Sequence, residues 1–169
     1  MGEEKDYLVI RRPEISDALR IAVICSEGWR QTVDGTMSES FQRSIISFWY
    51  TEDKVAGDIR RGSYSYVAEV NGVVAGVIGG GMTALDTSKV FVFYVDREYR
   101  YRGIGKELLA KITEGHRKRG AVCQWVSVQE GNEHGLPFYE ARGFVYQRDK
   151  KTKTETGEVQ ISRRYRREL

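Results

Sequence analysis

The segment from Val90 to Arg119 constrains the fold of this chain more than any other part of the sequence. It opens with an unbroken apolar and aromatic run, Val90 to Val95, which is too short for a typical helix and rich in strand-forming residues. We expect this strand to be buried on both faces, because apolar side chains occupy both of its alternating positions. A polar, arginine-rich turn follows the strand, and a pattern of helical period follows the turn.

Beyond the turn, apolar residues recur at the spacing of an amphipathic helix, at Ile104, Leu108, Leu109 and Ile112. Gly120 stands where a C-terminal helix cap would lie. A strand, a glycine turn and a helix in this order direct the free N–H groups of the first helical turn toward one point. The helix dipole and the absence of glycine side chains favour an anion there, most naturally a phosphate or diphosphate.

The glycines narrow the class of phosphate ligand. A Walker A loop continues into Gly-Lys-Ser/Thr, and this turn does not. The dinucleotide fingerprint needs a third glycine, and Leu108 occupies its place. Arg100 to Gly105 instead have the pattern Arg-x-x-Gly-x-Gly, with Lys106 directly after it. A strand-to-helix turn that uses glycine only for tightness would explain this pattern equally well, so the rest of the chain must decide.

Length and composition predict one domain spanning residues 1–169. No apolar run approaches membrane-spanning length, and the first ten residues are acidic, unlike a secretory signal. We therefore expect a cytoplasmic protein without a membrane partner. Cys25 and Cys123 fit no metal spacing, so we expect two free buried thiols and no metal. The sequence leaves a homodimer open.

Positive charge is concentrated near the C-terminus, although the net charge is only +3. The cations of this basic segment are Lys150, Lys151, Lys153, Arg163, Arg164, Arg166 and Arg167. Attraction to a polyanion such as nucleic acid is one interpretation. Because no nucleic-acid motif accompanies the charge, we favour a solvated strand and loop that protect a sheet edge.

The N-terminal third predicts one short strand and three helices. The strand is Tyr7 to Arg11. Ser16 or Asp17 can cap a first helix, which we expect to fray near Gly28 to Arg30. Ser38 can cap a second helix. Thr51 can cap a third helix that runs from Glu52 to Arg61. These pieces could line a substrate cleft or simply cover a sheet.

The remaining signals are those of strands. Asn71-Gly72 predicts a tight hairpin between Tyr64–Val70 and Val73–Ile78. Gly79 to Gly81 weaken the end of the second strand and indicate a bulge or a close backbone approach there. Val122 to Val128 form a buried strand after the central helix, which implies a parallel pair with the Val90 strand. Phe144–Tyr146 and Val159–Tyr165, joined by a polar Lys/Thr loop, suggest a final hairpin. The predicted fold is α/β, with one mixed, mostly antiparallel sheet, a central parallel pair and helices on both faces.

A second motif follows the Val122 strand and settles the choice of ligand. Asn132, Tyr139 and Gly143-Phe144 stand at fixed spacing after that strand. Together with Arg-x-x-Gly-x-Gly, this pattern resembles the GCN5-related N-acetyltransferase (GNAT) family, whose first motif is an acyl-CoA loop. The resemblance covers Tyr64 to Phe144 well and the first sixty residues only by pattern.

The resemblance implies an acyl-CoA N-acyltransferase-like fold and a set of site residues. The residues that it implies for binding acetyl-CoA are Phe93, Tyr94, Val95, Arg100, Tyr101, Arg102, Gly103, Ile104, Gly105, Lys106, Asn132 and Phe138. The loop amides of Tyr101 to Lys106 would hold the diphosphate, and the backbone of Phe93 to Val95 would pair with the pantetheine arm. The Val95 N–H is the candidate oxyanion donor, and Tyr139 is the candidate general acid toward the leaving thiolate.

The sequence departs from the family pattern in the second motif. Gly135-Leu136-Pro137 interrupts it, so we expect the following helix to start near Pro137, and a capping role for Asn132 is in doubt. An alternative for Phe138-Tyr139 is simple packing of a short helix.

The general base is open. Some relatives place a Glu where Lys89 stands, and a lysine there cannot serve. The candidate carboxylates are Glu27, Glu69, Asp86 and Glu130, each of which could equally be an ordinary surface or cap residue. We expect His134 to be a loop residue rather than a catalyst.

The sequence therefore predicts an acetyl-CoA-dependent N-acetyltransferase that acts on a primary amine of a small molecule or a protein by direct attack on the thioester. The alternative is a non-catalytic acyl-CoA-binding sensor module. A nucleic-acid-binding protein that uses the basic segment is a third hypothesis, which we do not favour.

Overall fold

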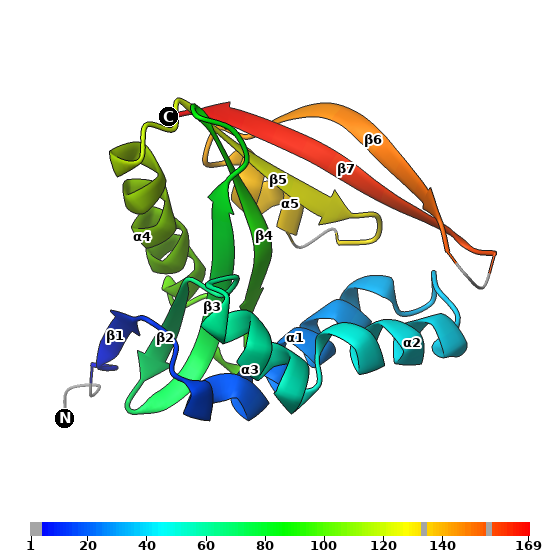
Figure 1. Ribbon diagram of the computed structural model, residues 1–169, viewed down its shortest axis with the longest axis horizontal. Helices are drawn as coiled ribbons and strands as arrows, with labels where there is room; N and C mark the ends of the chain where they lie inside the picture. Colours follow the sequence, from blue (N-terminus) through cyan, green and yellow to red (C-terminus); the bar gives the residue numbers. More distant parts are fainter. Residues whose placement is uncertain (1–4, 133–134, 155–156) are drawn as a thin grey trace.

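The computed structural model describes residues 5–132, 135–154 and 157–169. They form a seven-stranded sheet with the strand order β1-β2-β3-β4-β5-β7-β6 (Figure 1). The strands are β1 (Leu8–Arg11), β2 (Tyr66–Val70), β3 (Val73–Met82), β4 (Thr87–Val95), β5 (Cys123–Gln129), β6 (Val145–Lys153) and β7 (Val159–Glu168). Within the described ranges, β4 and β5 are the only parallel neighbours, which confirms the predicted fold class.

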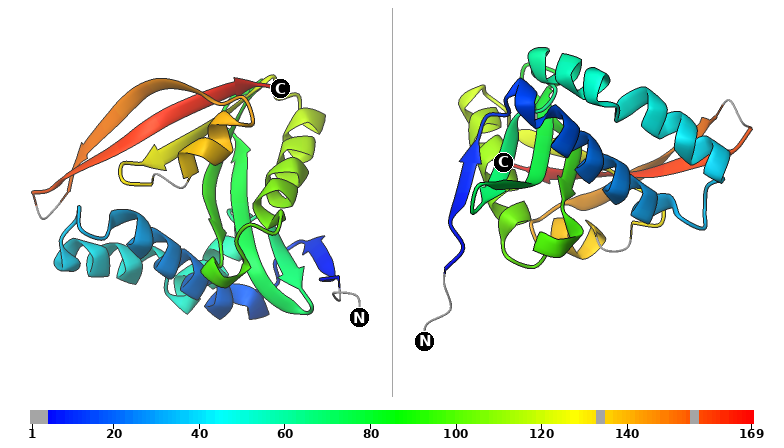
Figure 2. Two further views of the ribbon diagram at one scale, coloured as in Figure 1. Left: turned by 180° about the vertical axis from the view of Figure 1, so that it is seen from behind. Right: turned by 90° about the horizontal axis from the view of Figure 1, so that it is seen from below.

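Helices cover both faces of the sheet, as Figures 1 and 2 show. They are α1 (Ala18–Val33), α2 (Glu39–Trp49), α3 (Glu52–Arg60), α4 (Ile104–Lys118) and α5 (Gly135–Glu140), with 3-10 turns η1 (Ile15–Asp17) and η2 (Arg97–Tyr99). The apolar stripe of α4 packs with α5 on one face, and α1 with α3 forms a separate core on the other. The strand β4 is therefore covered from both sides along part of its length.

The caps predicted for the second and third helices are confirmed. The Ser38 hydroxyl accepts a hydrogen bond from the Phe41 N–H at 3.1 Å, and Thr51 does the same for Lys54 at 3.2 Å. The predicted fraying of the first helix at Gly28 is wrong, because α1 continues to Val33. A Cβ at Gly28 would lie 2.3 Å from the Tyr94 ring, so tertiary packing rather than helix termination explains this glycine.

The predicted hairpin is confirmed, and its second strand is longer than expected. Asn71 and Gly72 both have positive φ, 51° and 84°, as a tight hairpin turn of this kind requires. The strand β3 continues through Gly79 to Met82 instead of ending at the glycines. A Cβ at Gly79 would lie 2.0 Å from the Ser63 carbonyl oxygen, so glycine permits a close backbone approach there.

A β-bulge interrupts β4 and changes the burial of this strand. Val92 pairs with Gly79 and Val90 pairs with Gly80, which leaves Phe91 as an extra residue. Phe91 is 56% exposed, so the expectation that the whole Val90–Val95 run is buried on both faces is wrong. The bulge bends the strand at the point where it leaves its parallel neighbour.

The parallel pair is short. Only residues Thr87–Val90 of β4 pair with β5, where their partners are Cys123–Val126. The strand β5 continues beside β7 as far as Gln129. The second half of β4 therefore has a partner on its β3 side only. This separation of the two central strands creates the space in which the candidate site lies.

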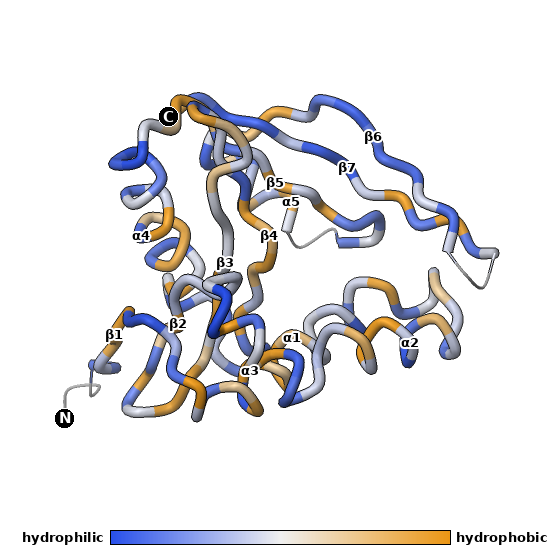
Figure 3. The backbone as a smooth tube through the Cα atoms, in the orientation of Figure 1, coloured by the Kyte–Doolittle hydropathy of each residue, from blue (hydrophilic) through white to orange (hydrophobic). Residues whose placement is uncertain are grey.

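The C-terminal hairpin is longer than predicted. The Lys/Thr segment expected as a loop belongs to β6, the outer strand of the sheet, whose residues are all exposed. Figure 3 shows β6 as predominantly hydrophilic. A charged outer strand is a common protection of a sheet edge. No helix in the described part of the chain is long and apolar enough to cross a membrane.

Candidate active site

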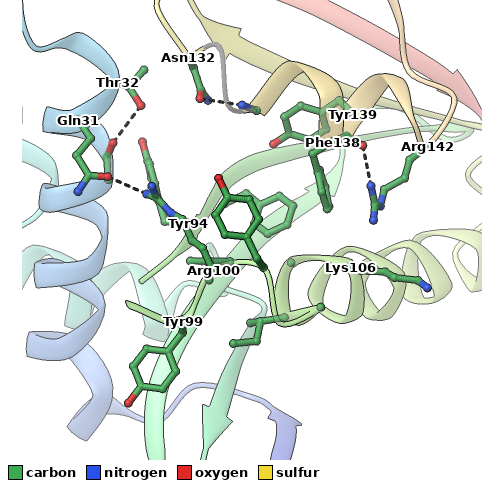
Figure 4. Close-up of a pocket in the computed structure, with 18 of the residues that line it drawn as sticks. Gln31, Thr32, Tyr94, Tyr99, Arg100, Lys106, Asn132, Phe138, Tyr139 and Arg142 are labelled. Atoms are coloured by element: carbon green, nitrogen blue, oxygen red, sulfur yellow. Dashed lines mark hydrogen bonds between the residues drawn. The ribbon is translucent and has the colours of Figure 1, made fainter. Parts of the chain in front are cut away.

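A cleft of about 530 Å³ opens where β4 and β5 separate (Figure 4). It is lined by Gly28, Gln31 and Thr32 of α1; Phe93, Tyr94 and Val95 of β4; Tyr99, Arg100, Tyr101 and Gly103 of the following loop; Ile104, Gly105 and Lys106 of α4; and Gly131, Asn132, Gly135, Phe138, Tyr139 and Arg142 around α5. Both predicted motifs thus line one cleft.

The loop before α4 presents backbone N–H groups to this cleft. The first hydrogen bond of α4 runs from the Glu107 N–H to the Gly103 carbonyl at 3.1 Å, so the amides before Glu107 in that turn have no acceptor within the helix. Tyr101 and Gly103 have positive φ, 65° and 80°, and the first of these is uncommon for a residue with a side chain. The turn is therefore shaped by backbone conformation rather than by side-chain caps.

Asp96 anchors the start of this loop. Its carboxylate accepts a hydrogen bond from the Glu98 N–H at 2.8 Å and forms an ion pair with Arg20 of α1. Its own N–H donates to the Ala75 carbonyl of β3 at 2.7 Å. Successive N–H groups of a strand alternate in direction, so those of Val95 and Phe93 point away from β3, to the side that β5 has left. Backbone groups of β4 are thus available to a ligand.

The two arginines of the turn lie differently. The Arg100 guanidinium donates a hydrogen bond to the Gln31 side chain of α1 at 2.8 Å and lines the cleft. Arg102 does not line it, because its guanidinium pairs with Asp6 at 3.1 Å and lies over the Tyr99 ring. The structure therefore separates the Arg102 side chain from the other residues predicted for the cofactor, all of which line the cleft.

Aromatic side chains form the wall opposite α1. The rings of Phe93, Phe138 and Tyr139 contact one another edge to face, with centroid separations of 5.5 to 6.3 Å. The Arg142 guanidinium lies 3.7 Å from the Phe138 ring centroid and donates to the Phe138 carbonyl at 2.9 Å. These contacts fix the orientation of α5 against β4.

Tyr139 combines burial with access to the cleft. The residue is only 8% exposed, and Figure 4 shows its hydroxyl directed into the cleft. Burial raises the pKa of Tyr139 above the ordinary value for a phenol, because the surroundings disfavour the phenolate. The side chain therefore stays protonated through the physiological range and can donate a proton or a hydrogen bond.

The second motif starts its helix earlier than expected. The helix α5 begins at Gly135 rather than near Pro137. The Asn132 side-chain oxygen accepts a hydrogen bond from the Gly135 N–H at 3.1 Å, so the doubt about a capping role for Asn132 is not supported. A cap at this position stabilises the first turn, and Pro137 stands within that turn, where a missing N–H costs little.

No carboxylate is among the described residues that line the cleft. Of the four candidate bases, Glu69 pairs with Arg11 at 3.2 Å, and Asp86 stands before β4, at the opposite end of that strand. Glu27 and Glu130 are exposed and adjoin Gly28 and Gly131 in sequence. His134 lies outside the described residues, and no group of described residues could hold a metal ion.

The sequence left open whether the N-terminal helices line a cleft, and the structure shows that α1 does. Gln31 and Thr32 line the cleft, and a Cβ at Gly131 would lie 2.8 Å from the Thr32 carbonyl oxygen. Gly28 interrupts an otherwise good helical sequence, and this glycine was the signal in the sequence that another segment packs closely against α1. Trp29 of the same helix does not line the cleft and packs on Phe41 in the protein interior.

Comparisons with known proteins agree with this geometry. The sequence model described as "Acetyltransferase (GNAT) family" matches residues 27–144. The chain is 27% identical over 139 residues to a spermidine N(1)-acetyltransferase of Thermoplasma acidophilum, covering 80% of this chain and 86% of that protein. It is 25% identical over 114 residues to the [ribosomal protein bS18]-alanine N-acetyltransferase of Escherichia coli (strain K12), covering 68% and 76%. The crystal structure of the PaiA N-acetyltransferase from Thermoplasma acidophilum in complex with coenzyme A superposes with a TM-score of 0.77 at 24% identity, covering 96% of this chain and 99% of that one.

Proposed function

This chain belongs to the GNAT family of acetyltransferases, and we propose from that premise how its cleft transfers an acetyl group. The protein is an N-acetyltransferase that uses acetyl-CoA and a primary amine. The family and the named relatives favour this activity over the alternative of a non-catalytic acyl-CoA-binding sensor. The observation that carries the proposal is the convergence of free loop amides, the exposed edge of β4 and a buried tyrosine on one cleft. The roles of individual residues below are our assignment.

The loop before α4 would hold the diphosphate of acetyl-CoA. The amides of Gly103 to Lys106 stand at the positive end of the α4 dipole and would donate to phosphate oxygens. Arg100 supplies a cation from the same cleft. Gly105 has no side chain between its amide and the cleft, so a charged ligand can approach the backbone closely.

The free edge of β4 would orient the acyl arm. The N–H groups of Phe93 and Val95 point toward the cleft and could pair with an extended amide-bearing arm, as an added strand would. The Val95 N–H would then donate a hydrogen bond to the oxyanion that develops as the amine attacks the thioester carbonyl. The aromatic rings of Phe93 and Phe138 would exclude water from this end of the cleft.

Tyr139 would donate the proton that the leaving thiolate needs. An alkyl thiol ordinarily has a lower pKa, about 8.5, than a phenol, about 10, so the transfer is unfavourable in water. Burial raises the pKa of a thiol as well, as the buried Cys25 of this protein illustrates. A thiolate in the same apolar surroundings as Tyr139 is destabilised for the same reason, which restores the driving force for proton transfer.

The acceptor amine must be neutral when it attacks. Because no described carboxylate lines the cleft, we propose that the amine reacts from its free-base fraction or first loses its ammonium proton to a water molecule. The proton that its nitrogen sheds when the amide forms would return through water to Tyr139, which has given its own proton to the thiolate. The relatives act on a polyamine and on a protein alanine, so the comparisons leave the acceptor class between a small amine and a polypeptide N-terminus.

A Tyr139→Phe variant tests the proposed acid. We expect kcat to fall by about 10²- to 10⁴-fold, which is the usual contribution of a positioned general acid. The affinity for coenzyme A, measured by calorimetry, should change less than twofold, because the ring and its packing are retained. Tyr7→Phe, at a residue that is 73% exposed, is the matched control and should retain full activity. An unchanged kcat in Tyr139→Phe would rule out the acid role.

A further inference from the structure

A second pocket, of about 250 Å³, lies where β4 begins and is lined mainly by β4 to β7. Its polar lining includes the side chains of Thr87, Lys89, Ser127, Arg148 and Arg164, with Trp125 among them. Lys89 pairs with Trp125 across the parallel strands, and Arg164 pairs with Ser127 and Arg148 across the antiparallel ones. These pairings bring together side chains from segments far apart in the sequence.

The charges of this pocket are not compensated. Its described lining holds three cations and no carboxylate, and none of Lys89, Arg148 and Arg164 forms an ion pair with a described residue. The Arg164 Nε is the one buried side-chain nitrogen, among the residues described, that has no hydrogen-bond partner. The Arg148 guanidinium lies 5.6 Å from the Trp125 ring centroid.

Unpaired cations held this close together cost free energy. Burial, together with the nearby charges of Arg164 and Lys150, lowers the pKa of Lys89. An unpaired buried donor and mutually repelling cations are stabilised most effectively by an anion that accepts several of their hydrogen bonds. The hydroxyl of Ser127 adds a further donor suited to a carboxylate, whereas that of Thr87 already donates to Asp86 at 2.9 Å.

The strand β4 connects this pocket to the cleft. Lys89 precedes Phe93 by four residues and Val95 by six, which corresponds to about 13 to 20 Å along a strand. The exposed Phe91 lies between them on the face that carries Lys89, because a Cβ at Gly81, the partner of Lys89, would lie 3.6 Å from the Phe91 ring. An extended ligand could follow this face of the sheet from one site to the other.

We propose that the pocket around Lys89, Arg148 and Arg164 binds an acidic side chain of the acceptor, and that the acceptor is a polypeptide N-terminus with Asp or Glu near its fifth residue. From the reacting amine beside Val95, four residues of extended peptide span about 13 Å of the roughly 20 Å to Lys89, and the side chains of the acidic residue and of Lys89 bridge the remainder. The inference rests on the proposed function of the cleft. It chooses an acidic polypeptide over a polyamine, whose charges the three cations would repel.

Acetylation of two matched peptides tests this inference. They are identical except for Glu or Gln at position five, and release of the coenzyme A thiol is followed. We expect wild-type kcat/KM to be about tenfold higher for the Glu peptide, because charge-assisted hydrogen bonds are the stronger ones. This preference should disappear in Arg164→Gln and in Lys89→Gln. It should persist in Lys118→Gln, which removes the same charge from the exposed surface of α4.

The position of the acidic residue is tested separately. Moving Glu to position two should abolish the preference, since the side chain would then be too close to the amine to reach the pocket. Equal kcat/KM for the Glu and Gln peptides in the wild type, or an equal preference for Glu at positions two and five, would overturn the inference. So would loss of the preference in Lys118→Gln. Should Arg164→Gln fail to unfold cooperatively, Lys89→Gln carries the same test.

Direct binding separates failure of the inference from failure of the proposed function. The same two peptides with acetylated N-termini cannot accept an acetyl group, and their affinities are measured by calorimetry. A Glu preference in binding that is lost in Arg164→Gln supports the pocket even if no peptide is acetylated. Acetylation of both peptides at equal rates supports the cleft and rejects the pocket.

Discussion

A pair of glycine substitutions in one helix can separate the binding role of the loop from the stability of the fold. Gly105 and Gly115 both belong to α4, and neither has a positive φ. A Cβ at Gly105 would meet Phe93 at 3.5 Å and Phe138 at 3.6 Å, which are ordinary contacts, and a Cβ at Gly115 would meet nothing within 4 Å. Both alanine variants should therefore fold.

The two variants should differ in their affinity for coenzyme A. Gly115→Ala removes a helix-interior glycine and should stabilise the protein by up to about 1 kcal/mol. That gain corresponds to a rise in Tm of about 2 to 4 °C for a chain of this size. Gly105→Ala should leave Tm nearly unchanged but places a methyl group beside the amides that we assign to the diphosphate. Loss of one hydrogen bond to a charged group costs about 1.5 to 3 kcal/mol, or roughly 10- to 150-fold in affinity.

Calorimetric titration with coenzyme A and thermal denaturation of the same preparations measure the two effects. We expect Kd to rise at least tenfold in Gly105→Ala and to stay within twofold of wild type in Gly115→Ala. A Gly105→Ala variant that binds coenzyme A as tightly as wild type would refute the assignment of the diphosphate to this turn. A fall of more than a few degrees in its Tm would refute the claim that the methyl group is accommodated by the fold.

Two further predictions concern pH and packing. With a peptide acceptor, kcat/KM should rise as the α-amine loses its proton near pH 8 and should not fall before about pH 10. The reason is that burial raises the pKa of Tyr139, so its active protonated form persists to higher pH; a falling limb below pH 10 that vanishes in Tyr139→Phe would contradict this. Gly79→Ala should lower Tm by about 5 to 10 °C, at a cost of roughly 2 to 3 kcal/mol, because the new Cβ meets a backbone oxygen at 2.0 Å that cannot rotate away. Thermal denaturation measures the change in Tm, with Gly115→Ala as the comparison. A Tm of Gly79→Ala equal to that of the wild type would contradict the close packing of Gly79 on Ser63.

Local patterns in the sequence predicted most elements of the fold. Asn71-Gly72 predicted the hairpin because few other residue pairs tolerate positive φ at two successive positions. Ser38 and Thr51 marked helix starts because their hydroxyls accept bonds from amides three residues ahead. The helical period after Gly105 predicted α4 because its apolar stripe repeats every three to four residues. Each of these signals acts over a few residues.

The errors arose where distant segments meet. Gly28 suggested a helix end, but it lies within the helix, where the Tyr94 ring leaves no room for a Cβ atom. Gly79 to Gly81 indicated a bulge or a close backbone approach, and both are present, but the strand was expected to end at Ile78 and continues through the glycines to Met82. The basic Lys/Thr segment suggested a loop, and pairing with β7 makes it a strand. In each case a tertiary contact outweighed the local preference.

The sequence by itself determined the glycine turn, the helix behind it and the spacing of Asn132 and Tyr139, because backbone conformation and periodicity are local properties. Only the tertiary structure decided that β4 leaves β5 after Val90, that α1 closes the cleft, and that Arg102 faces Asp6 rather than the cleft. It also gathered Lys89, Arg148 and Arg164 into one pocket from three strands. Strand pairing and bulges join residues far apart in the chain, and no local pattern specifies which of them will meet.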